Sequence, residues 1–177
     1  MPLSQVTQVE EAARKISRRL PEIGLQESIL SRTAVILGRD LTSRLDQLLA
    51  PAGLAELEFR LLLNLFARGG TAFPGELCPA LAQSPANLTR ISDLLVERGL
   101  ITRAPDPDDR RKLALSITPA GEQLAKDLTP QVTSYMTRLY RDFTDQDRVQ
   151  FMDYLKRLVA ALDALSVEDS GAQESSS

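Results

Sequence analysis

Two short segments of the chain gather small or hydrogen-bonding side chains that can approach nucleic-acid bases and phosphates. The first segment contributes Ser84, Pro85, Ala86, Asn87, Thr89 and Arg90. The second contributes Arg110, Arg111 and Lys112, which follow the acidic residues Asp106, Asp108 and Asp109. An Asn side chain can read adenine through two hydrogen bonds, and an Arg can read guanine or bind a phosphate. This chemistry predicts a surface that contacts DNA.

The first segment opens a predicted helix over residues 85–98. Leu88, Ile91 and Leu95 recur at helical spacing and form a buried stripe, which leaves the polar side chains on the other faces. Ser84 is a suitable N-cap, and the proline after it suits the first helical position. A solvated helix face with no ligand has the same pattern, so this helix alone does not establish DNA binding.

A shorter predicted helix over residues 75–82 precedes the first segment. Its apolar residues, Cys78 among them, face inward, and Pro79 lies inside the first turn or just beyond it. A tight turn separates the two helices. This arrangement is a helix-turn-helix, whose second helix enters the major groove of DNA.

The second segment lies at the tip of a predicted β-hairpin. Residues 100–104 and 112–118 alternate between apolar and smaller or polar side chains, as half-buried strands do. The loop PDPDDRR between them is rich in turn residues. An Arg at such a tip can enter the minor groove of DNA, while Asp109 pairs with the other Arg and shapes the loop.

Further amphipathic helices flank this core and leave more apolar surface than one small domain can cover. They are predicted over residues 5–20, 25–50, 54–67, 119–141 and 144–166, the last opened by a capping box of Thr144 and Asp147. The fold class is mainly α with a small β-hairpin wing, a winged helix-turn-helix domain plus a helical dimerisation domain. The predicted divisions are dimerisation helices 1–50, DNA-binding domain 51–118, dimerisation helices 119–167 and a disordered tail 168–177. A homodimer follows from the excess apolar surface.

Composition excludes several classes of function. The chain has no His, which removes the Ser-His-Asp triad and the HExxH zinc site, and its single Cys cannot form an intrachain disulfide. We therefore expect no enzyme, no cofactor and no metal site. No signal peptide or membrane-length apolar run is visible, which predicts a cytoplasmic protein without membrane contact. The net charge of −3 opposes DNA binding, although residues 84–112 carry one more basic than acidic residue.

Four motifs carry a resemblance to a known family. They are LAELEFRLLLNLF, SPANLTRISDLLVERGLITR, DPDDRRKLALSIT and TPAGEQL, in this order and without insertions. Together they resemble the MarR family of bacterial regulators, and NLTRISDLLVERGLI is most similar to the branch that represses multidrug-efflux pumps (MprA/EmrR-like). Pro79 and the helix at 5–20 depart from the usual family pattern.

The resemblance implies a homodimer that is held together by its N- and C-terminal helices and binds pseudo-palindromic, double-stranded operator DNA through its winged domains. It implies that Arg90 is the recognition-helix arginine, Arg111 the wing-tip arginine and Asp109 the residue that braces the wing. A small aromatic, often anionic effector would release the DNA, and Leu37, Arg39, Phe59, Leu62, Phe66 and Tyr135 lie in the segments where it could bind.

Two alternative functions remain open at this stage. A winged helix can serve as a protein-interaction module without DNA binding, which the acidic composition favours. A redox-sensing regulator would use Cys78, although its inward position indicates a structural thiol.

Overall fold

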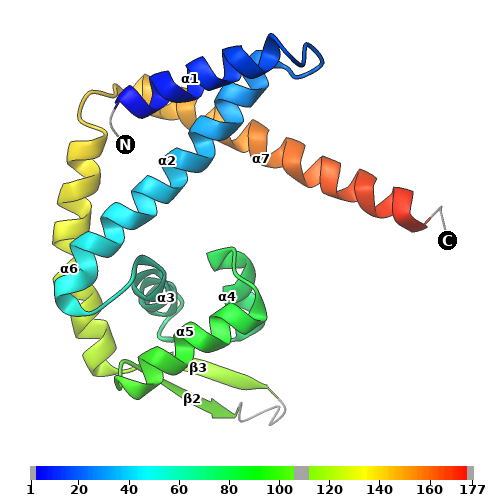
Figure 1. Cartoon of the computed structure of the whole chain (residues 1–177). Helices are drawn as coiled ribbons and strands as arrows, with labels where there is room; N and C mark the ends of the chain where they lie inside the picture. Colours follow the sequence, from blue (N-terminus) through cyan, green and yellow to red (C-terminus); the bar gives the residue numbers. More distant parts are fainter. Residues whose placement is uncertain (1–2, 106–111, 175–177) are drawn as a thin grey trace. The chain divides into compact units, whose positions relative to one another are not determined.

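The computed structural model describes residues 3–105 and 112–174, with side chains described for 4–105 and 112–165 (Figure 1). Arg110, Arg111 and Asp109, predicted for the wing tip, therefore lie outside the described residues. The chain divides into two compact units, one up to Val132 and one from Thr133 onward. The described elements are mainly helical with a small antiparallel sheet, which confirms the predicted fold class.

The first unit contains all described elements up to the first part of α6. In chain order these are α1 (Leu3–Ser17), α2 (Leu25–Leu49), the 3₁₀ turn η1 (Ala50–Ala52), α3 (Glu56–Ala67), β1 (Thr71–Ala72), α4 (Pro74–Leu81), α5 (Pro85–Glu97), β2 (Ile101–Pro105), β3 (Leu113–Ile117) and α6 (Pro119–Leu139). Helix α7 (Asp145–Glu174) belongs to the second unit.

The sheet has three strands in the order β1–β3–β2, all antiparallel. Strands β2 and β3 form the predicted hairpin, with Arg103 opposite Leu115. Strand β1 is a third strand that the sequence analysis missed, because two residues are too short to show an alternating pattern. The hydroxyls of Thr71 and Ser116 lie 2.8 Å apart and join β1 to β3.

A leucine-rich core beneath this sheet positions α5. Leu88, Ile91 and Leu95 are each at most 2% exposed, as the predicted stripe requires. They pack with fully buried residues of the neighbouring helices and strands, namely Leu61, Leu62, Leu65, Leu77, Leu81 and Leu115. The buried stripe fixes which face of α5 points to solvent.

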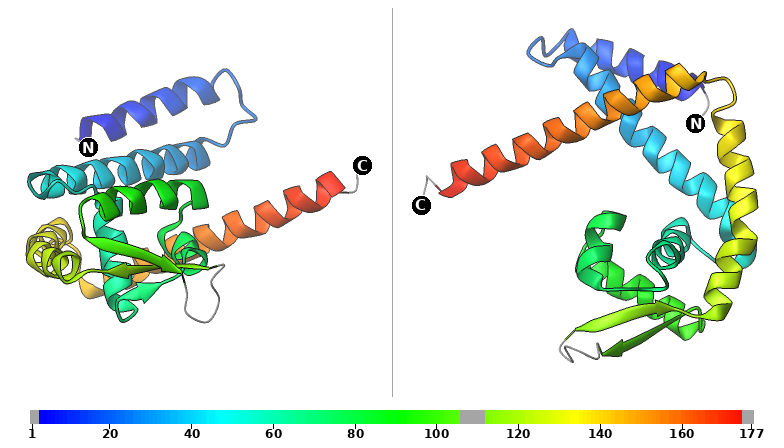
Figure 2. Two further views of the ribbon diagram at one scale, coloured as in Figure 1. Left: turned by 90° about the horizontal axis from the view of Figure 1, so that it is seen from below. Right: turned by 180° about the vertical axis from the view of Figure 1, so that it is seen from behind.

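Helix α1 folds back against α2 (Figure 2). The two helices pack through a face of α2 that differs from the predicted stripe in its N-terminal half. Leu45 is buried as predicted, but Leu30 and Leu37 are 68% and 48% exposed, and Ile29 and Ile36 are half-buried instead. The prediction of one stripe was therefore wrong there, because α2 has two apolar faces and a single chain covers only one.

The first turn of α6 is locked onto the winged fold. The Thr118 hydroxyl donates to the carbonyl oxygens of Gly99 (2.8 Å) and Leu100 (3.1 Å) and accepts from the Gly121 N–H (3.1 Å). Gly121 is buried, and a Cβ at this position would overlap the Leu100 carbonyl and lie 3.0 Å from Ile117 Cγ1. Glycine is therefore required for this close approach.

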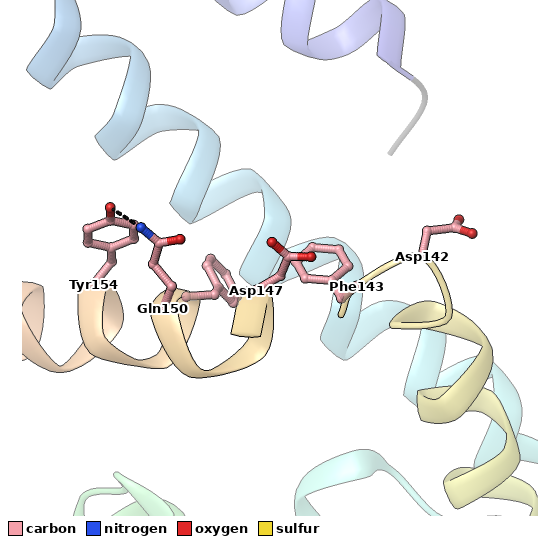
Figure 3. Close-up of a pocket in the computed structure, with 6 residues that line it drawn as sticks. Asp142, Phe143, Asp147, Gln150 and Tyr154 are labelled. Atoms are coloured by element: carbon pink, nitrogen blue, oxygen red, sulfur yellow. Dashed lines mark hydrogen bonds between the residues drawn. The ribbon is translucent and has the colours of Figure 1, made fainter. Parts of the chain in front are cut away.

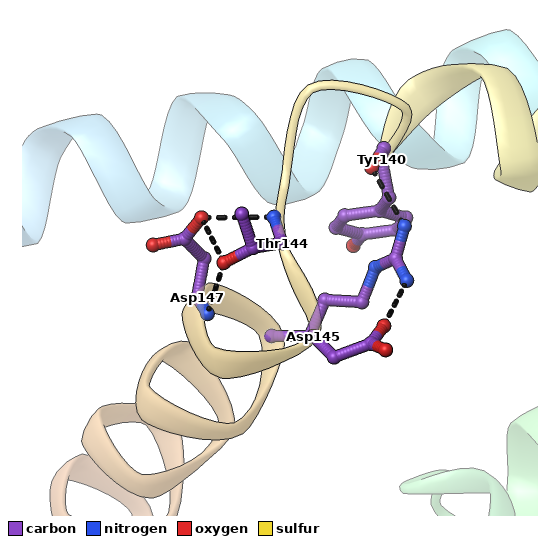
Figure 4. A network of polar contacts seen from close by, with 5 residues as sticks. Tyr140, Thr144, Asp145 and Asp147 are labelled. Atoms are coloured by element: carbon purple, nitrogen blue, oxygen red, sulfur yellow. Dashed lines mark hydrogen bonds and ion pairs between the residues drawn. The ribbon is translucent and has the colours of Figure 1, made fainter.

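Helix α7, in the second unit, begins with the predicted capping box (Figure 4). The backbone N–H and hydroxyl of Thr144 donate to Asp147 Oδ2 at 2.8 and 2.7 Å, and the Asp147 N–H donates back to the hydroxyl at 3.1 Å. These bonds, the hydroxyl first, hold the pKa of Asp147 below its ordinary value. Arg148 braces the same turn by pairing with Asp145 (2.8 Å) and donating to the Tyr140 carbonyl oxygen (3.0 Å).

Helix α7 continues to Glu174, beyond the predicted end near residue 166. The backbone of 168–174 is therefore helical where the sequence analysis predicts a disordered tail. A helix that is already nucleated adds one hydrogen bond for each further residue, so a polar end without apolar periodicity can still continue it.

We predict that Gly121→Ala destabilises the protein by about 2–4 kcal/mol, because the added Cβ must displace backbone at a packed junction. Gly75→Ala is the matched control: Gly75 is an exposed residue of α4 with open space around its Cβ position, so this change should leave stability within about 1 kcal/mol. Urea unfolding at one protein concentration measures both. Equal stability of the two variants would contradict the assigned contact.

Candidate nucleic-acid interface

The turn between α4 and α5 sets the direction of the candidate recognition helix. Ala82 ends α4 in the left-handed conformation (φ +52°), and the Gln83 N–H bonds the Cys78 carbonyl oxygen at 2.9 Å. Ser84 Oγ then accepts the Asn87 N–H at 3.3 Å, which confirms Ser84 as the N-cap of α5.

Helix α4 departs from its prediction in one detail. It begins at Pro74, so Pro79 is its sixth residue and lies in the second turn. The helix thus starts one residue before the predicted range of 75–82, and Pro79 lies just beyond its first turn. Pro79 leaves the Gly75 carbonyl without its helical donor, and the exposure of Gly75 lets water replace that bond.

Most of the predicted DNA-contacting residues lie on the solvent face of α5. The exposed members are Ser84, Pro85, Ala86, Thr89 and Arg90, and Lys112 is exposed at the foot of β3. Asn87 is only half-buried in the same face. The Thr89 hydroxyl donates to the Pro85 carbonyl oxygen (2.9 Å) within its own helix. Arg110 and Arg111 lie outside the described residues.

Three side chains on this face form a hydrogen-bond chain. Asn87 Nδ2 donates to Gln83 Oε1 at 2.5 Å, and Asn87 Oδ1 accepts from Arg90 Nε and Nη2 at 3.2 and 3.0 Å. Gln83 Nε2 donates in turn to the Leu81 carbonyl oxygen at 3.2 Å. The sequence analysis did not select Gln83, although its spacing of four residues from Asn87 is the signal for such a contact.

An arginine from the hairpin fastens the middle of α5. Arg103 Nη2 donates to Ser92 Oγ at 2.6 Å and pairs with Asp93 Oδ1 at 2.8 Å. Ser92 is 1% exposed, and its hydroxyl donates to the Thr89 carbonyl oxygen (2.9 Å). The recognition helix and strand β2 are thereby joined through a buried polar contact.

A second arginine fastens the end of α5. Arg98 donates to the carbonyl oxygens of Gly53 (2.5 Å) and Ala52 (2.9 Å) in the turn after α2. At the same junction Asp46 accepts the Glu56 N–H at 2.7 Å, and burial raises the pKa of the Glu56 carboxyl. Arg98 and Arg103 are two of the basic residues counted within 84–112. Their contacts show that both stabilise the fold.

Cys78 is half-buried and packs against the core from α4, so its side chain lies inward as the sequence predicts. Within the described part of the chain, no group of three acidic or cysteine side chains could hold a metal ion. None of the described helices is long and apolar enough to cross a bilayer.

The sequence model of the MarR family matches residues 54–113, from the approach to α3 to the first residue of β3. The chain is 30% identical to YhbI of Bacillus subtilis (strain 168), an uncharacterized HTH-type transcriptional regulator, over 122 residues, which are 69% of this chain and 76% of YhbI. The chain belongs to the MarR family.

Similarity within the MarR family extends well beyond the winged fold. The transcriptional repressor MprA of Escherichia coli (strain K12) is 27% identical over 163 residues, 92% of this chain and 93% of MprA. A mutant of MarR from E. coli, crystallised with operator DNA, matches with a TM-score of 0.67 at 23% identity over 73% of this chain and 92% of that one. At this identity, the match to the MarR structure shows that the two chains share a fold.

We predict that Arg103→Met lowers the free energy of unfolding by about 1–2 kcal/mol, most of it from the lost bond to buried Ser92, since the pair with Asp93 is solvent-screened. Arg68→Met is the matched control, because Arg68 pairs with Glu76 only at 3.9 Å on an exposed surface and should cost at most about 0.5 kcal/mol. Chemical denaturation measures the free energy of unfolding of both variants. An equal loss in the two would contradict a stabilising role for the Arg103 contacts with Ser92 and Asp93.

Proposed function

We propose that this MarR-family chain is a homodimeric transcriptional repressor that binds pseudo-palindromic operator DNA. The observation that carries the proposal is the exposed polar face at the start of α5, held in place by a buried apolar stripe and by Arg98 and Arg103. Such a helix enters the major groove with its N-terminal residues against the base edges. The relative MprA is named a transcriptional repressor, and operator DNA is bound in the MarR structure, which supports both parts.

Exposed apolar residues support the homodimer. In the second unit, the exposed apolar side chains of α7 are Val149, Met152, Leu155, Leu158, Val159, Leu162 and Leu165, each between 40% and 72% exposed. In the first unit, Leu30 and Leu37 of α2 are exposed as well. Soluble monomers seldom expose so many large apolar groups, and a second copy of the chain would cover them.

The regulated genes and the signal follow from the branch that the sequence motifs resemble. The operon would encode an efflux or resistance function, regulated in the cytoplasm, and a small aromatic, often anionic effector would release the repressor. Phe59 and Leu62 are at most 3% exposed, so they support the core instead of lining an effector site. Phe66 is exposed, and Lys126 Nζ lies 5.4 Å from its ring centroid while it pairs with Glu122. An anionic aromatic ligand at this position would compete with Glu122 for the lysine.

A shallow pocket of about 340 Å³ in the second unit is a poorer effector site (Figure 3). Phe143, Phe151 and Tyr154 offer aromatic surface there, but the carboxylates of Asp142 and Asp147 share the lining. An anionic ligand would meet two like charges, which costs free energy.

The dimer is tested by light scattering at micromolar concentration. We expect twice the chain mass of 19.5 kDa for the wild type and a large shift toward monomer or unfolded chain for Leu158→Glu. Lys156→Glu, which changes a polar position of the same helix, should keep the dimer. A monomeric wild type would exclude the proposed assembly.

Operator binding is tested by fluorescence anisotropy with duplexes from the promoter of the chain's own gene. We expect Arg90→Ala to weaken binding at least tenfold, since it removes the main base or phosphate contact of α5. The control variant Glu97→Ala, at the far end of α5, should bind like the wild type. Titration with salicylate-like acids should lower the affinity of the wild type by about 5- to 150-fold. Failure of the wild type to bind any promoter duplex would favour an interaction module.

A further inference from the structure

We infer that Asn87 is a positioning residue, which Gln83 orients and which holds the Arg90 guanidinium ready to read one guanine. This inference rests on the proposed DNA binding and deepens it. It replaces the sequence-based interpretation that Asn87 itself reads adenine.

The orientation of each amide is set by its neighbour. The Leu81 carbonyl oxygen can only accept, so the Gln83 amide must turn its Nε2 toward it and its Oε1 toward Asn87. Asn87 must then present Nδ2 to Gln83 and Oδ1 to Arg90. Leu81 is fully buried at the end of α4, so the chain of hydrogen bonds starts from a rigid point.

Asn87 has no acceptor capacity left for a base. To read adenine, an Asn side chain must accept from the N6 amino group through its oxygen while it donates to N7. The two lone pairs of Asn87 Oδ1 already accept from Nε and Nη2 of Arg90, and the side chain is half-buried.

Arg90, in contrast, keeps the edge that guanine requires. Its guanidinium has five N–H groups, and the two bonds to Asn87 use the edge formed by Nε and Nη2. The other edge, Nη1 with the second N–H of Nη2, can donate to O6 and N7 of guanine. Arg90 is exposed, and holding its long side chain in advance lowers the entropy cost of binding.

The test measures which base pair each residue controls. The probe is the tightest duplex that the wild type selects from a randomised double-stranded library, together with a panel in which each base pair is replaced in turn. Arg90→Ala should abolish the preference for one G·C pair, worth roughly 5- to 150-fold in affinity. Asn87→Ala should reduce the preference at that same pair at least about fivefold, and Gln83→Ala about threefold.

A double-mutant cycle tests the order of action. If Gln83 acts through Asn87, the double variant Gln83→Ala/Asn87→Ala should discriminate no worse than Asn87→Ala alone. Glu97→Ala should keep the base preference, and all variants should keep the thermal midpoint within a few degrees and a similar salt slope. These readouts separate positioning of Arg90 from a loss of fold or of phosphate contacts.

Three results would overturn the inference. Asn87→Ala could relax an A·T pair that Arg90→Ala leaves intact, which would mean that Asn87 reads adenine. The variants could weaken all duplexes equally, which would assign Arg90 to a phosphate. The losses of base preference in Gln83→Ala and Asn87→Ala could add in the double variant, which would mean that Gln83 does not act through Asn87. A wild type that selects no sequence would instead refute the proposed function itself.

Discussion

Burial of one face of α5 is the constraint on which the candidate interface depends. Leu88, Ile91 and Leu95 are removed from water by the leucine core, and this fixes the rotation of the helix about its axis. Once that rotation is fixed, the polar residues of the first turns face solvent. Arg103 and Arg98 then hold the middle and the end of the helix to the hairpin and to the turn after α2. A site built on such a restrained element presents its side chains with little freedom to lose on binding.

The small surplus of basic residues in the winged region has a structural explanation. Arg98 bonds to backbone carbonyls and Arg103 to Ser92 and Asp93, so the fold holds both side chains in place, and Asp93 offsets the charge of Arg103. Together with the net charge of −3, this small surplus leads us to expect weak non-specific attraction to DNA phosphates. Under the proposed function, recognition would rely on a few directed contacts, and among the described residues of α5 we propose Arg90, which is hydrogen-bonded to Asn87, as the main one.

The first turn of α6 links this interface to the rest of the chain. Thr118 and Gly121 bind the helix start to Leu100, so α6 cannot change direction at this end without disturbing the root of the hairpin. The same helix continues out of the first unit, and the second unit carries the exposed apolar side chains of α7. In the proposed homodimer a second copy would cover these side chains, and an effector that changes the spacing of the two recognition helices would lower the affinity for DNA.

The sequence by itself determined the helix-turn-helix, the hairpin and the Ser84 and Thr144 caps, because periodicity and capping are local and short-range. It also placed Arg90 on the exposed face. Only the tertiary structure decided the short strand β1, the packed face of α2 and the roles of Arg98, Arg103 and Gln83. Strand β1 and the two arginines depend on partners far apart in the chain, such as Ser116 for Thr71 and Ala52 for Arg98, and no local pattern records such partners. For Gln83 and Asn87 the spacing was local, but the direction of each hydrogen bond was set by a buried carbonyl that only the folded chain supplies.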